Sequence, residues 1–143
     1  MTTFKQPLRV GDKSENSVGM AVLAQVTTQS YAEASKVLAR LPRPYQVIDI
    51  QVDILTAFNA ATTNTLDLGV TGDLDRYADN LSLTAAGRVL ATSDVSELSG
   101  LVDTTDDGGT TEIIGTYAQT GTAATAGLAR ITVLYTCTKT PDV

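Results

Sequence analysis

The stretch VIDIQVDIL, residues 47–55, decides the fold class of this chain. Apolar residues occupy every second position and polar residues lie between them: Ile48, Ile50, Val52 and Ile54 alternate with Asp49, Gln51 and Asp53. Successive side chains of a β-strand point to opposite faces of the sheet. The pattern therefore predicts a strand with one face in a hydrophobic core and the other in water or against a polar partner.

The residues on both sides of this stretch carry break signals and further strand patterns. In LPRPYQ, residues 41–46, Pro42 and Pro44 favour extended backbone in the residues before them and mark a break. Residues 31–41, YAEASKVLARL, fit a helix or a strand that ends at Pro42, and we favour the strand. Residues 59–64 predict a polar turn, and TLDLGV, residues 65–70, predicts a short strand that ends at Gly72.

Further alternation extends toward both ends of the chain. Residues 17–28, 81–92, 111–120 and 128–138 predict strands, and in the last of these Ile131, Val133 and Tyr135 share one face. Residues 121–127, GTAATAG, predict a turn of small residues, and residues 94–111 end in a loop rich in Asp, Thr and Gly. Residues 72–80, GDLDRYADN, predict one helical turn with Asp73 as its N-cap.

The composition favours the same fold class. The 143 residues include 23 Thr but only four Glu and four Lys, and β-branched side chains suit a pleated strand. Seven or eight strands with regularly spaced turns predict an all-β, single-domain β-sandwich, jelly-roll-like, or a barrel. We expect this domain to span residues 17–143. The polar residues 1–16 predict an extended N-terminal arm or a frayed terminus.

Composition also excludes several classes of function. The chain has no His, which rules out a Ser-His-Asp triad and His-ligated zinc. Its single cysteine, Cys137, is expected to be a reduced, buried structural thiol. A net charge of −6 disfavours nucleic-acid binding. No apolar run is long enough to span a membrane, and residues 1–17 do not resemble a secretory signal, so we expect synthesis in a cytoplasm.

Two groups of acids are candidate calcium sites. Asp103, Asp106 and Asp107 precede Gly108 and Gly109, but the twelfth position of a calcium loop would be Ile114 instead of Glu, which favours a solvated hairpin loop. Asp73, Asp75 and Asp79 flank Arg76 and are a second candidate, with local pairing to the arginine as the alternative. We favour the alternative at both places and expect no cofactor.

Catalysis has little support in the sequence. Two carboxylates could hydrolyse glycosides, but such enzymes usually offer aromatic platforms, and this chain has no Trp, two Phe and five Tyr. No glycine-rich phosphate loop of the GxxxxGK[ST] or GxGxxG kind is present. We therefore expect a non-enzymatic protein.

Three stretches carry a family resemblance: LPRPYQVIDIQVDILTAFN (41–59), TLDLGVTGDLDRYADNLSLTAAGRV (65–89) and GTYAQTGTAATAGLARITVLY (115–135). Over about residues 40–136 the chain resembles small virion proteins of tailed bacteriophages, of the capsid decoration, or cement, type. The shared motifs mark strands and turns, so no functional residue is carried over. The resemblance implies a protein made in the host cytoplasm that binds the major capsid protein on the outer head surface, stabilises the head and forms a homo-oligomer, commonly a trimer.

Two other classes of function stay open. One is a different virion component, at the head–tail junction or in the tail. The other is a carbohydrate- or receptor-binding β-sandwich module, because loops of a sandwich suit ligand display. For the cement hypothesis we place capsid binding in the N-terminal arm, around Phe4, Leu8 and Arg9.

Overall fold

The computed structural model describes residues 21–91 and 101–138 of the chain. These residues form nine β-strands and no α-helix. The described residues therefore contain no helix that could cross a membrane. The strands are β1 (Leu23–Ser30), β2 (Ser35–Pro42), β3 (Tyr45–Thr56), β4 (Thr63–Val70), β5 (Asp73–Ser82), β6 (Gly87–Leu90), β7 (Val102–Asp103), β8 (Thr110–Thr120) and β9 (Leu128–Cys137).

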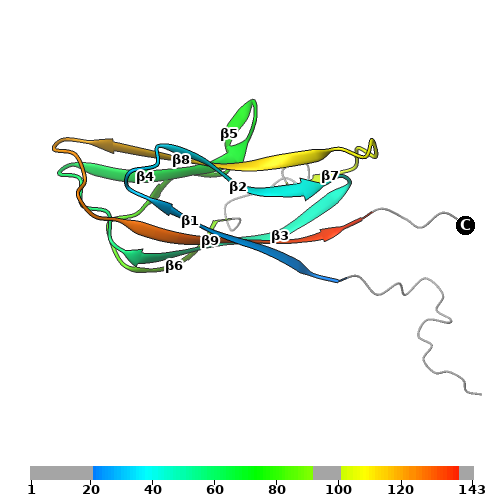
Figure 1. Cartoon of the computed structure of the whole chain (residues 1–143), viewed down its shortest axis with the longest axis horizontal. Helices are drawn as coiled ribbons and strands as arrows, with labels where there is room; N and C mark the ends of the chain where they lie inside the picture. Colours follow the sequence, from blue (N-terminus) through cyan, green and yellow to red (C-terminus); the bar gives the residue numbers. More distant parts are fainter. Residues whose placement is uncertain (1–20, 92–100, 139–143) are drawn as a thin grey trace, which may run out of the picture.

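The strands build two antiparallel sheets that pack face to face (Figure 1). One sheet has the order β1-β9-β3-β6, with β7 beside β3, and the other has the order β2-β8-β4-β5. Leaving the two-residue β7 aside, the first strand pairs with the last, the second with the second-last, the third with β6, and β4 with β5. This is the pairing of a doubled-over hairpin, so the predicted all-β, jelly-roll-like sandwich is confirmed.

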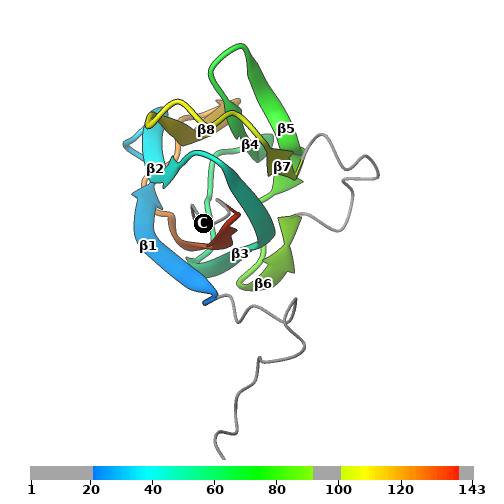
Figure 2. The ribbon, with the colours of Figure 1, turned by 90° about the vertical axis from the view of Figure 1, so that its right-hand side faces the viewer.

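The core lies between the inner faces of the two sheets. Figure 2, an end-on view, shows the sheets curving around it. Both sheets contribute side chains that are almost fully buried: Val47, Ile50, Val52, Ile131 and Val133 from one, and Leu41, Leu66, Leu68, Tyr77 and Ile113 from the other. On β9 the buried residues alternate with more accessible ones. Ile131, Val133 and Tyr135 are all buried, so the prediction that they share one face is confirmed.

The decisive strand is confirmed, but one of its residues points the other way. The register between β3 and β9 shifts between Val47 and Asp49, which marks a β-bulge. Val47 takes the inward position, and Ile48 is exposed. Beyond the bulge Ile50, Val52 and Ile54 are buried as the alternation predicts. Alternation in the sequence does not show this bulge. The extra residue of β3 changes how β3 pairs with β9, but it does not interrupt the alternating pattern of residues 47–55.

The predicted helical turn at residues 72–80 is wrong. These residues belong to the hairpin of β4 and β5, which turns at Thr71 and Gly72. The register shifts twice along the hairpin, and the consecutive residues Tyr77 and Ala78 are both buried. Asp73, the expected N-cap, instead begins β5 and forms an ion pair with Arg76 at a spacing of three residues, which would also suit a helical turn.

Two ambiguous segments now have definite structures. Residues 31–41 contain strand β2, which ends at Pro42, so the strand alternative is confirmed. In residues 17–28 the described strand begins at Leu23. Its polar residues Gln25 and Gln29 face the other sheet, while Val26 points outward. The large apolar side chain of Val26 therefore lies on the solvent side of this edge strand.

The expectation of a buried thiol is wrong: Cys137 is exposed. It is the last residue of β9, paired with Tyr45 at the first residue of β3, and so lies at the end of the sheet. The predicted loop at residues 94–111 also contains a short strand, β7. Strands of two residues are too short to give a periodic pattern.

Candidate interaction surface

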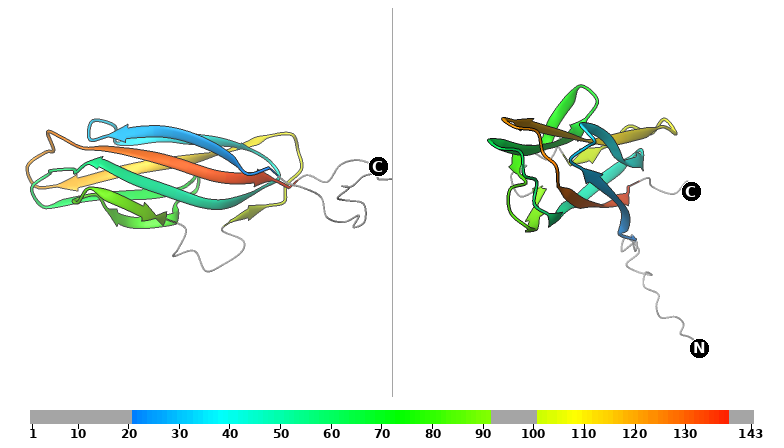
Figure 3. Two further views of the ribbon diagram at one scale, coloured as in Figure 1. Left: turned by 90° about the horizontal axis from the view of Figure 1, so that it is seen from below. Right: turned by 60° about the vertical axis from the view of Figure 1, so that its left-hand side comes forward.

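The outward face of the β1-β9-β3-β6 sheet is the candidate functional surface, and we call it the outer sheet face. Figure 3 (left) shows these four strands side by side. Directly opposed residues of antiparallel strands point to the same face of a sheet. The register therefore arranges the outward side chains in rows: Val26, Thr132, Gln51 and Leu90 in one row, and Thr28, Arg130, Asp53 and Arg88 in the next.

Several large apolar side chains of this region are open to solvent. Val26 is 58% exposed, Ile48 44% and Leu90 46%. They come from three different strands, and Val22, just before β1, is exposed as well. Thr132 and Gln51 lie between Val26 and Leu90, so these exposed apolar residues share one face of the sheet without being contiguous. The outer sheet face thus offers several separate apolar contacts among polar side chains.

A buried carboxylate and two arginines lie in the second row. The Arg88 guanidinium donates to both oxygens of Asp53, with Nε–Oδ1 2.6 Å and Nη2–Oδ2 3.1 Å, and Arg130 Nη2 donates to Oδ2 at 2.9 Å. The Asp53 side chain is 11% exposed, while Arg88 is 55% and Arg130 47% exposed. Hydrogen bonds from Arg88 and then from Arg130 lower the pKa of Asp53 to about 2. The carboxylate is therefore ionised and fixes two guanidinium groups that reach solvent.

The outer sheet face differs in charge from the rest of the described chain. The outer sheet face holds two acids, Asp49 and Asp53, and two arginines, so its formal charge is balanced. The other described residues hold nine acidic and four basic side chains. The sandwich therefore combines a charge-balanced, partly apolar face with an acidic remainder.

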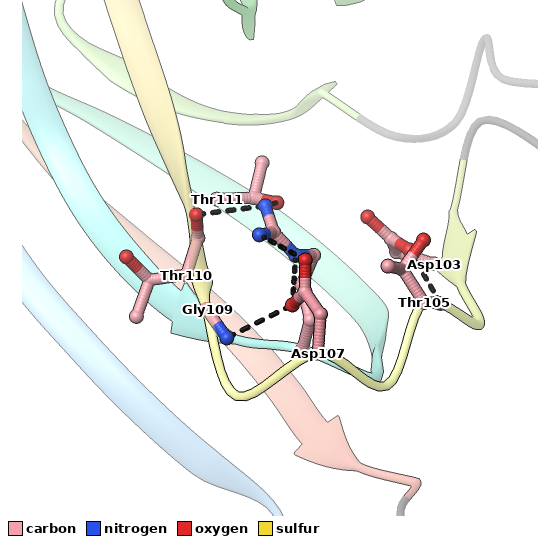
Figure 4. Close-up of polar contacts among 7 residues, drawn as sticks. Asp103, Thr105, Asp107, Gly109, Thr110 and Thr111 are labelled. Carbon is pink, nitrogen blue, oxygen red and sulfur yellow. Dashed lines mark hydrogen bonds and ion pairs between the residues drawn. The ribbon is translucent and has the colours of Figure 1, made fainter.

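The acids of the β7–β8 loop make structural contacts (Figure 4). Asp107 accepts hydrogen bonds from Arg43 Nε (3.2 Å) and Nη2 (3.0 Å), and its Oδ1 accepts one from the Gly109 amide (2.9 Å). The Arg43 hydrogen bonds are the largest cause that lowers the pKa of Asp107. Asp103 instead accepts a hydrogen bond from the Thr105 amide and lies apart from Asp107 in Figure 4. Arg43 therefore holds the β7–β8 loop through Asp107. In a calcium loop, the acids would instead converge on the cation.

The second acidic group is also dispersed. Asp73 pairs with Arg76 at 3.1 Å, as the local-pairing alternative predicts, and Asp79 accepts a hydrogen bond from the Asn80 side chain. Across residues 21–91 and 101–138, no three His, Cys, Asp or Glu side chains come together as a metal site would need. Neither calcium hypothesis gains support from the described part of the chain.

The docking residues predicted from the sequence, Phe4, Leu8 and Arg9, lie outside the described residues, so their role stays a prediction. The outer sheet face was missed because its parts are far apart in the sequence: Asp53 is 35 residues from Arg88 and 77 from Arg130. One local signal was present, because residues 17–28 carry small or apolar side chains on both faces.

Comparison with known proteins is informative at the level of the fold. No protein-family model and no curated protein sequence matches the chain. A chain of the cyanophage Pam1 capsid asymmetric unit superposes with a TM-score of 0.64 and 18% identity, covering 96% of this chain and 94% of that one. A chain of the acid-stable capsid of Helicobacter pylori bacteriophage KHP30 superposes with a TM-score of 0.50 and 12% identity, covering 88% and 95%. At these identities the likeness shows a shared fold.

Proposed function

We propose that this chain is a non-enzymatic structural protein of a bacteriophage virion, which binds the outer surface of the head as a decoration, or cement, protein. The observation that carries the proposal is the superposition on a chain of the Pam1 capsid asymmetric unit over nearly the full length of both chains. The virion-protein motifs at residues 41–59, 65–89 and 115–135 favour the same class. The partner in this proposal is the major capsid protein.

The two-sided surface suits that role. A decoration protein needs one face that contacts the shell and another that stays in solvent. The outer sheet face offers exposed apolar side chains with balanced charge, while the remaining described residues carry an excess of acids. Charged surfaces keep proteins soluble and disfavour contact with nucleic acid, whereas apolar clusters favour protein contact. Self-association, for which we propose a trimer, would pair or cover edge strands such as β5 and β6.

The arrangement of acids favours a structural role over an enzymatic one. Asp53 and Asp107 are each held by arginines, with pKa values below the ordinary range. A general acid in glycoside hydrolysis needs a raised pKa, so neither carboxylate suits that chemistry.

The two alternatives make different demands on the surface. A carbohydrate-binding module needs exposed aromatic rings, but Phe58 and the tyrosines other than Tyr31 are buried among the described residues. The resemblance fits a head–tail or tail component as well as a head protein, and location on the particle separates these two. A tail component would bind tails, and a cement protein would bind preassembled heads.

The experiment is light scattering of the purified chain followed by sedimentation with DNA-free heads. The heads should be assembled from the shell protein of the same phage in the absence of this chain. We expect a stable oligomer that sediments with the heads and saturates. A protein that stays in the supernatant would overturn the cement proposal, and sedimentation with isolated tails would favour the alternative.

The N-terminal arm is a second part of the proposal. Deleting residues 2–12 removes Phe4, Leu8 and Arg9 and leaves every described residue in place. If the arm docks on the head, the shortened chain keeps its melting temperature and loses head binding. Unchanged binding would reject the role of the arm and leave head binding by the folded domain intact.

A further inference from the structure

We propose that the outer sheet face docks on the shell protein, and that the contacted surface is apolar and carries a carboxylate that accepts hydrogen bonds from the remaining N–H groups of Arg88 and Arg130. The inference rests on the proposed function and adds the docking face and the chemistry of the partner.

Large apolar side chains on three strands of this face contact water. Val26 and Leu90 stand at opposite ends of one row across the sheet, with Thr132 and Gln51 between them. Exposed Ile48 lies at the bulge of β3. Burying a large aliphatic side chain on association is favourable in proportion to the apolar surface removed from water. Interface cores combine such apolar residues with arginine, and lysine is depleted there. Of the four charged side chains on this face, two are arginines and none is a lysine.

Arg88 and Arg130 keep hydrogen-bond donors that Asp53 does not use. A guanidinium has five N–H donors. Arg88 directs two of them to Asp53 and Arg130 directs one, while about half of each arginine side chain stays exposed. One carboxylate facing two guanidinium groups leaves one positive charge in excess within the row. A partner carboxylate would neutralise that charge and accept charge-assisted hydrogen bonds.

Preorganisation strengthens this contact. Asp53 holds both arginines in place before a partner arrives, and its pKa of about 2 keeps it ionised across physiological pH. Ordering a long side chain costs conformational entropy on association, and arginines that are already fixed avoid part of that cost. Charge complementarity therefore selects an acidic partner at this row, although the chain as a whole is acidic.

The test uses three variants of the full chain. Val26→Asp places a charge in the apolar area at an exposed position of β1, and Arg130→Gln removes the excess positive charge with a polar side chain. The matched control is Arg40→Gln, which removes an exposed arginine paired with Glu112 at 3.0 Å on the other sheet. Each variant is first checked for an unchanged strand signal by circular dichroism. Binding to DNA-free heads of the same phage is then measured by sedimentation at low and high salt.

We expect Val26→Asp and Arg130→Gln to bind about tenfold more weakly or worse, as alanine-type changes at the centre of interfaces do. The Arg40→Gln control should bind like the unchanged chain. The loss caused by Arg130→Gln should shrink at high salt, because salt screens the ion pair that it removes.

Three results would overturn the inference, and they are distinguishable. Equal binding by all variants would reject the docking face while the cement function stands. A changed oligomeric state of Val26→Asp without heads would assign the face to contacts between copies of this chain. Failure of the unchanged chain to bind heads would reject the proposed function and this inference together.

Discussion

The Gln25 side chain binds the main chain of Arg40 as a neighbouring strand would. Its Nε2 donates to the Arg40 carbonyl at 2.7 Å, and its Oε1 accepts from the Arg40 amide at 2.9 Å. Gln25 lies on β1 and Arg40 on β2, the edge strands of the two sheets. Unpaired edge groups invite association with other chains, and here one carboxamide satisfies a donor and an acceptor together. The contact joins the two sheets along this edge.

Removing that contact should lower stability without changing the fold. We expect Gln25→Ala to lower the free energy of unfolding by about 1–3 kcal/mol, because each net hydrogen bond contributes about 0.5–1.5 kcal/mol. Urea unfolding followed by circular dichroism measures the change. Thr28→Ala, on the exposed side of the same strand, is the control and should differ from the unchanged chain by less than about 0.5 kcal/mol. Equal losses in both variants would show that the Gln25–Arg40 contact has no special role.

The second prediction concerns acid stability. The pKa of Asp53 is about 2 in the folded chain, below its ordinary value of 3.8, because Arg88 and Arg130 stabilise the carboxylate. A lowered folded-state pKa gives stability that is complete above the ordinary pKa and is lost as the pH falls through the folded one. Asp53→Asn should therefore lower the melting temperature at pH 7. Its melting temperature should also fall less steeply than that of the unchanged chain between about pH 4 and 2. A parallel pH profile for both proteins would contradict the Asp53 assignment.

The third prediction concerns calcium. Asp107 is committed to Arg43 and to the Gly109 amide, so the β7–β8 loop has no carboxylate cluster for a cation. A ligand at a hundred times its dissociation constant would stabilise the fold by about 2.7 kcal/mol. We expect millimolar Ca²⁺ to leave the melting temperature unchanged, with Mg²⁺ at equal ionic strength as the control. A rise with Ca²⁺ alone would restore the calcium hypothesis for one of the Asp groups.

Local patterns in the sequence predicted most of the strands. The errors concern features that depend on how the strands pair. Alternation at residues 47–55 and 128–138 identified β3 and β9 correctly, because each strand has one face in the core. The outward turn of Ile48 depends on a bulge against β9, and the strand at residues 73–82 depends on pairing with β4. The bulge is set by pairing with residues distant in the sequence. The pairing of β4 with β5 is local, and the signal for it was the turn at Thr71 and Gly72, which periodicity alone does not identify.

The candidate surface was harder to predict for the same reason. Asp53 was recognised as a polar residue opposite the core, but its two arginines come from β6 and β9. A pairing register is needed before these three residues share a row. The predicted docking residues in the N-terminal arm lie outside the described ranges, so their role stays a prediction.

The last prediction concerns the close approach of the two strands in the β4–β5 hairpin. A Cβ at Gly69 would collide with the main chain of Asp73 and Leu74, whereas a Cβ at Gly72 would meet no neighbouring atom. Gly72 instead has a φ of 88°, which costs an L-residue about 1–2 kcal/mol. We expect Gly72→Ala to lose about that amount. Gly69→Ala should lose more, above about 3 kcal/mol, because main-chain atoms of a paired strand yield less readily than the end of a side chain.

Urea midpoints of Gly69→Ala and Gly72→Ala test this difference, with the denaturant slope as a check that both variants unfold in one step. The comparison is internal because both changes add one methyl group to the same hairpin. A larger loss for Gly69→Ala indicates that β5 packs directly on the main chain of β4, as a strand shifted in register does. Equal losses, or a larger one for Gly72→Ala, would mean that the hairpin relaxes around the added methyl group and that turn geometry limits its stability.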